Sequence, residues 1–107
     1  MNHVVTSTHF EDDLSRLPAA DRKRVLTVLR DTLPSEPLPP NLNIKAIKGH
    51  APWLRLRVGD WRIIFRPLAR GELEAVRRRH GRESVRGYYV ETVIKRSGLP
   101  RVVRKLK

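Results

Sequence analysis

Hydrophobic and polar residues alternate with a period of two along residues 53–66, on both sides of the pair Gly59-Asp60. This alternation predicts a β-hairpin with a two-residue turn. Gly59 stands at the first central position, which suits a type II′ turn because that position needs a positive φ. The turn fixes the register, so one face of the hairpin is wholly apolar. The pairs on that face are Val58 with Trp61, Leu56 with Ile63 and Leu54 with Phe65.

The opposite face of the predicted hairpin is strongly basic. Its residues are Trp53, Arg55, Arg57, Arg62, Ile64 and Arg66. In the predicted register Arg57 lies directly across from Arg62. Like charges at facing positions of an antiparallel pair destabilise it by ~0.2–1 kcal/mol. Because the fold gains nothing from this arrangement, we expect an anionic ligand to bind there.

The N-terminal third of the chain predicts a strand followed by two helices. Residues 2–6 are β-branched and precede Ser7-Thr8, which reads as a helix N-cap. Pro18 separates two stretches with helical spacing and is well placed to begin the second of them. The apolar positions are Phe10, Leu14 and Leu17 in the first, and Val25, Leu26, Leu29 and Leu33 in the second. Two helices joined in this way predict an αα-hairpin lying across a sheet.

The remaining segments complete the predicted fold. Four prolines within residues 34–43 predict a stiff, extended connection, and residues 44–49 lead into the hairpin. Residues 69–87 are polar and charged and predict a hairpin insertion with a short helix near residues 73–79. Residues 88–95 predict a central strand, and residues 99–107 form a basic tail with apolar residues available to dock. We therefore expect one α+β domain over residues 1–107, in the order β-α-α-β-β-β. Its antiparallel-rich sheet of about four strands would have the two helices packed on one face.

Composition narrows the possible partners. The 107-residue chain has 23 Lys and Arg against 11 Asp and Glu, a formal charge of 23 − 11 = +12. Such an excess favours phosphate-rich or acidic partners, and the preference for Arg over Lys favours planar recognition of phosphate or carboxylate. There is no cysteine, and no apolar run approaches the length of a membrane span. We find no signal peptide, so we expect a cytoplasmic protein that does not interact with membranes.

The basic face of the hairpin is the strongest candidate for chemistry. Guanidinium groups bind phosphate oxygens in bidentate fashion and stabilise negative charge that develops during phosphate chemistry. Trp53 could stack on a nucleobase, or it could be a partly buried aromatic at the sheet edge. Arg96 and Lys95 end the last predicted strand and would join the cluster if that strand lies beside the hairpin. The four histidines lack the spacing of metal ligands, so we expect neither a metal nor another cofactor.

The segment from Lys48-Gly49 through Trp53-Leu54-Arg55-Leu56-Arg57-Val58-Gly59-Asp60-Trp61-Arg62-Ile63-Ile64-Phe65 resembles the RelE/ParE toxin superfamily. The resemblance implies a RelE-like fold of the microbial-ribonuclease type. Members similar to RelE cut mRNA in the ribosomal A site without a metal, leave a 2′,3′-cyclic phosphate, and are neutralised by an antitoxin. The resemblance implies that four arginines bind the scissile phosphate and stabilise the transition state: Arg55, Arg57, Arg62 and Arg96. We expect Lys48, Trp53, Arg66 and Lys95 to contribute to substrate binding.

The chain departs from the RelE pattern at two points. Many RelE-like enzymes carry a lysine in the strand pair that is arginine here, and a tyrosine shortly after the arginine that ends the last strand. The sequence has no tyrosine after Arg96; Tyr88, Tyr89 and His50 are conceivable substitutes. Three functions remain open: a ribosome-dependent mRNA endonuclease, a non-enzymatic gyrase inhibitor similar to ParE, and a degenerate module that binds RNA or antitoxin. All three imply an acidic antitoxin as partner, and the first also implies mRNA on the ribosome.

Overall fold

The computed structural model describes residues 2–35, 43–81 and 86–106. The strands in these ranges are β1 (His3–Thr6), β2 (Ile44–Ala46), β3 (Leu54–Val58), β4 (Trp61–Pro67) and β5 (Gly87–Lys95). The helices are α1 (Thr8–Ser15), α2 (Ala19–Thr32), α3 (Arg70–His80) and α4 (Leu99–Val103), with a 3-10 turn at Arg96–Gly98. None of the helices in these ranges is long and apolar enough to cross a membrane.

The strands form one mixed sheet in the order β1-β5-β4-β3-β2. β5 lies inside the sheet, parallel to β1 and antiparallel to β4, which confirms the central position predicted for it. The expected number of about four strands is too low. The additional strand, β2, pairs antiparallel with β3 over only three residues. A segment this short carries too little alternation to be distinguished from a loop in the sequence.

The hairpin of β3 and β4 has the register that its alternation predicts. Leu54 pairs with Phe65, Leu56 with Ile63, Arg57 with Arg62 and Val58 with Trp61. Gly59 adopts φ +59°, as required at the first central position of the predicted turn. The hairpin therefore presents one apolar and one basic face.

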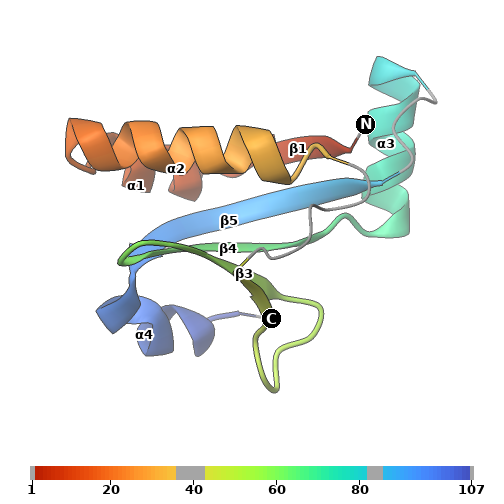
Figure 1. The fold of residues 1–107 in the computed structure, drawn as a ribbon. Helices are drawn as coiled ribbons and strands as arrows, with labels where there is room; N and C mark the ends of the chain where they lie inside the picture. The colour runs from red at the N-terminus through yellow and green to blue at the C-terminus, as the bar shows by residue number, and fades with distance from the viewer. Residues whose placement is uncertain (1, 36–42, 82–85, 107) are drawn as a thin grey trace.

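The apolar face of the hairpin packs under α1 and α2, which lie together on one side of the sheet in Figure 1. The Ser7 hydroxyl accepts a hydrogen bond from the backbone N–H of Phe10 at 3.0 Å, which confirms the predicted N-cap of α1. The main core is built from both helices, from the segments that follow them, and from β3, β4 and β5. Its residues are all buried: Phe10, Leu17, Val25, Leu29, Leu33, Leu56, Val58, Ile63, Phe65, Tyr88, Val90 and Val93. The predicted packing of the two helices on one face is confirmed.

The C-terminal tail covers part of the other face of the sheet. α4 and the residues after it pack against a second cluster of buried residues, Ile47, Trp53 and Ile64. In Figure 1, α4 lies across the sheet from α1 and α2.

The segment predicted as an insertion contains a longer helix than expected. α3 runs over Arg70–His80, and its first turn is tied to β4 by Glu72, whose carboxylate accepts two hydrogen bonds from Arg66 at 2.7 and 3.1 Å. Residues 82–85 of this segment lie outside the described residues, as do Pro37, Pro39 and Pro40 of the predicted stiff connection.

Candidate functional site

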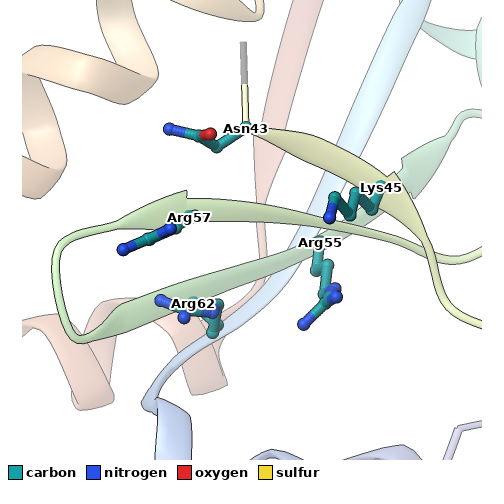
Figure 2. Close-up of a pocket in the computed structure, with 5 residues that line it drawn as sticks. All are labelled: Asn43, Lys45, Arg55, Arg57 and Arg62. Atoms are coloured by element: carbon teal, nitrogen blue, oxygen red, sulfur yellow. The ribbon is translucent and has the colours of Figure 1, made fainter.

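A small basic pocket lies on the face of the sheet opposite α1 and α2. Its lining side chains come from β2 and the residue before it, from β3 and from β4: Asn43, Lys45, Arg55, Arg57 and Arg62. Figure 2 shows Arg57 and Arg62 on the two neighbouring strands of the hairpin, with Arg55 farther along β3 and Lys45 on β2. The volume of the pocket is about 120 Å³. We call it the arginine pocket.

Arg57 and Arg62 approach one another as closely as the sheet geometry allows. The backbone N–H of Arg57 donates to the carbonyl of Asn43 on the β2 side, at 3.0 Å, so it points away from β4. Arg57 and Arg62 therefore form a non-hydrogen-bonded pair, the kind in which facing Cα atoms are only ~4.5 Å apart. Two cations are held side by side by the backbone register itself.

The guanidinium of Arg62 is fixed in place. The side chain is buried, with 6% of its surface exposed. Its Nη1 donates to the carbonyl oxygens of Gly59 at 2.8 Å and Trp61 at 2.9 Å. Burial lowers the pKa of Arg62 from its ordinary value, and the neighbouring cations, Arg57 first, lower it further; Asp60 acts in the opposite direction. The remaining donors of a rigid, fork-shaped group are thus available to an anion.

Arg96 belongs to the same electrostatic cluster although it comes from another element. Its backbone N–H donates to the carbonyl of Asp60 at 2.8 Å, which ties the end of β5 to the hairpin turn. Its charge, like that of Arg55, contributes to the lowered pKa of Arg62. The structure therefore brings Arg55, Arg57 and Arg62 into one pocket, with Arg96 near enough to act on Arg62 electrostatically but lining a neighbouring hollow. Within residues 2–35, 43–81 and 86–106, none of them forms an ion pair with a carboxylate.

Two residues of the pocket are missing from the sequence prediction. Lys45 lies directly opposite Arg55 in the β2–β3 register, and Asn43 accepts the hydrogen bond from Arg57. Asn43 immediately precedes β2, and Lys45 lies within it. The only signal that could have found them is the pair of lysines at positions 45 and 48, separated by apolar residues.

The substrate-binding roles predicted for Trp53 and Arg66 do not fit the structure. Trp53 is 8% exposed and lies in the cluster under α4, so it has no free face for a nucleobase. The guanidinium of Arg66 lies over the rings of Trp53 and Tyr89 and forms a bidentate ion pair with Glu72. Hydrogen bonding by Glu72 raises the pKa of Arg66 despite its burial. Arg66 therefore holds α3 against β4 instead of extending the arginine pocket.

The two predicted lysines also lie apart from the pocket. Lys95 pairs with Trp61 across the strands, and its Nζ lies 5.8 Å from the centre of that indole. It therefore lies on the face that α1 and α2 cover. It lines a separate hollow beside Asp60 and Arg96. Lys48 is exposed in the loop after β2 and does not line the arginine pocket.

The residues considered as substitutes for the absent tyrosine do not line the pocket either. Tyr88 is buried in the main core against Phe65. Tyr89 packs edge-on against Trp53, and burial raises its pKa, with a further contribution from Glu91. His50 lies in the turn after β2. In the described part of the chain, no group of three or more His, Asp or Glu is arranged to hold a metal ion.

Solved structures share this fold. The chain superimposes with a TM-score of 0.63 and 23% identity on the RelB-RelE antitoxin-toxin complex from Methanococcus jannaschii, covering 92% of this chain and 96% of that one. The archaeal RelE-RelB complex from Pyrococcus horikoshii OT3 gives a TM-score of 0.60 and 21% identity, covering 89% and 94%. YafQ from E. coli gives 0.53 and 15%, covering 92% and 98%. No protein-family model matches the sequence, and no curated protein matches it. The chain therefore has the fold of the RelE-like toxins.

Proposed function

We propose that this chain is the toxin of a type II toxin–antitoxin system and that it cleaves mRNA on the ribosome without a metal. The observation that carries the proposal is the arginine pocket, in which cations from β3 and β4 converge without an ion-pairing carboxylate among the described residues. Holding Arg57 beside Arg62 costs folding free energy, and an anion that binds between them recovers that cost. The likeness to two RelE-RelB complexes along nearly the whole chain supports a toxin that binds an antitoxin.

The proposed reaction is an internal transesterification. The 2′ oxygen of a ribose attacks the adjacent phosphorus, the bond from phosphorus to the 5′ oxygen breaks, and the products are a 2′,3′-cyclic phosphate and a 5′ hydroxyl. Negative charge accumulates on the non-bridging oxygens during this step. The donors of Arg55, Arg57 and Arg62 stabilise it, and those of Arg62 are held in place by the turn carbonyls, so they need no reorganisation during the reaction.

Lys45 supplies the proton transfer in this proposal. An arginine side chain does not give up its proton in proteins, and an amide does not titrate. Lys45 is the remaining residue that lines the pocket, and it lies beside Arg55. Its ammonium group gives a proton to the departing 5′ oxygen, while water accepts the proton of the 2′ hydroxyl. Lys45→Arg keeps the charge, so we expect it to retain substrate binding and to slow cleavage by ~10²-fold or more, the usual range for one acid–base group.

The proposed partner is an acidic antitoxin. With a formal charge of +12, the chain attracts an acidic segment that covers its basic surface. The electrostatic share of the affinity should fall as salt is raised, because ions screen exposed charges. A complex whose dissociation constant is flat between low and high salt would contradict this part of the proposal.

Induced expression in cells tests the proposed function. We expect growth arrest with new mRNA 5′ ends inside translated reading frames, lost in Arg57→Gln and kept in Arg101→Gln, which removes an equal charge from exposed α4. Arrest without new ends, together with inhibition of DNA supercoiling by gyrase, would replace the proposal with a gyrase inhibitor. The absence of arrest in a strain that lacks any antitoxin would indicate a degenerate binding module.

A further inference from the structure

A second hollow begins where the arginine pocket ends, and it lies between α2 and β3. Its lining residues come from α2, from the residue before β2 and from the end of the hairpin: Arg24, Val28, Asn43, Leu56, Arg57, Val58 and Gly59. Its volume is about 490 Å³, within the ~300–1,000 Å³ range of small-molecule sites. We call it the α2–β3 groove.

The side chain of Arg24 lies against the hairpin turn at Gly59. A Cβ built on Gly59 would lie 2.9 Å from Nη1 of Arg24, closer than real Cβ contacts allow. The guanidinium therefore rests against the turn. Arg24 is exposed and forms no ion pair within the described residues, so its donors are available to a ligand.

The groove and the arginine pocket are continuous. They share Asn43 and Arg57 as a common wall. Arg57 lines both hollows because it lies at the end of the β2–β3 pairing. Within the described residues, the last contact of β3 on that side is the hydrogen bond from Arg57 to Asn43. A chain of repeating anions that occupies the pocket can therefore continue into the groove and reach Arg24.

The lining of the groove combines the groups that a nucleotide needs. Arg24 and Arg57 supply cations for a phosphate, while the half-buried Val28 supplies apolar surface for a base, with Leu56 and Val58 buried behind it. The side-chain amide of Asn43 has both donors and an acceptor for the edge of a base. These cations are continuous with those of the arginine pocket, which favours a strand with regularly repeating phosphates over an acidic peptide.

We infer that the α2–β3 groove is a nucleotide subsite that holds the residue of single-stranded RNA next to the scissile phosphate, with Arg24 bound to the neighbouring phosphate. This inference rests on the proposed function, because it extends the same RNA strand beyond the arginine pocket. It assigns a substrate-binding role to α2, a helix that otherwise packs on the sheet.

The test uses fluorescein-labelled 2′-O-methyl oligoribonucleotides, which cannot be cleaved because the attacking hydroxyl is blocked. A dinucleotide with one phosphate and a tetranucleotide with three are titrated with the folded full chain over a range of KCl concentrations, and binding is followed by fluorescence anisotropy. Wild type is compared with Arg24→Gln and with Arg30→Gln, a control on α2 that removes the same charge from a side chain 74% exposed.

We expect Arg24→Gln to weaken tetranucleotide binding by about fivefold or more and to lower the salt slope by about 0.7, the value for one phosphate contact with a single strand. Arg24→Gln should change dinucleotide binding by less than about twofold. Arg30→Gln should change the binding of either probe by less than about twofold, because it alters only the non-specific electrostatics. Equal losses in the two variants, or equal losses for the two probes, would overturn the inference. Unchanged tetranucleotide binding with weaker binding of a poly-glutamate peptide would overturn it in favour of an acidic protein partner.

Failure of this inference is distinguishable from failure of the proposed function. Oligonucleotide binding that depends on Arg24, in a chain that does not cleave ribosome-bound mRNA, would support the subsite and contradict the endonuclease. Cleavage at unchanged rates and positions by Arg24→Gln would contradict the subsite and leave the endonuclease standing.

Discussion

The facing pair Arg57 and Arg62 predicts that removing one charge makes the protein more stable and less active. Arg57 is exposed, so Arg57→Gln removes its charge without leaving a cavity in the core. Its backbone N–H still donates to Asn43. Relief of like-charge repulsion across the strands contributes about 0.2–1 kcal/mol. Since 1 kcal/mol shifts the melting temperature of a domain of this size by roughly 4–8 °C, the expected rise is about 1–8 °C.

Thermal unfolding followed by circular dichroism measures this rise, with Arg101→Gln as the control for net charge. The rise should shrink in 1 M NaCl, where the Debye length is about 3 Å. Inorganic phosphate should stabilise wild type more than Arg57→Gln, because an anion bound to the folded state alone raises its stability by mass action. A melting temperature that falls in Arg57→Gln, or that rises equally in Arg101→Gln, would refute the claim that the pocket is held under electrostatic strain.

Three further predictions follow from other contacts. Hydrogen bonding to Arg66 lowers the pKa of Glu72. The stability that this pair contributes is therefore complete above the ordinary carboxyl pKa of about 4.3. It is lost as the pH falls through the lower pKa of the native state. Glu72→Gln should thus cost about 1 kcal/mol or less at pH 7 and nothing in strong acid, as measured by denaturant unfolding at several pH values; a constant difference would contradict this. Gly59→Ala should cost about 1–2 kcal/mol because of the positive φ, and a neutral effect would show that the turn tolerates a side chain. Trp53→Ala should cost about 3–5 kcal/mol as a core truncation; full stability with weaker RNA binding would restore its predicted stacking role.

The hairpin and its arginines could be predicted because one short segment contains both the alternation and the turn. The pairing of Arg57 with Arg62 follows from a two-residue loop alone, since that loop fixes the register. The structure adds what a local pattern cannot contain. Arg96 reaches the cluster through a hydrogen bond to Asp60, and Lys45 reaches it through a strand of three residues.

The burial of Trp53 and the ion pair of Arg66 could not be predicted from the sequence, for a common reason. Alternation tells which face a side chain occupies but not what covers that face. Trp53 shares a face with the arginines, yet α4 covers it, and the ion-pair partner of Arg66 comes from α3, in a segment interpreted as an insertion. Burial and ion pairs depend on how elements dock in three dimensions, which a periodic pattern does not encode.

The most direct measurement of the central claim is single-turnover cleavage of a short mRNA positioned in the A site of purified ribosomes, by wild type and by Arg62→Lys. The wild type should cleave the mRNA without a metal and leave a 2′,3′-cyclic phosphate. Arg62→Lys should retain the fold and cut about 10²–10³-fold more slowly, because it loses the planar fork that the turn carbonyls hold in place. Absence of cleavage by the wild type, or equal rates for the two proteins, would contradict the claim that this pocket performs phosphate chemistry.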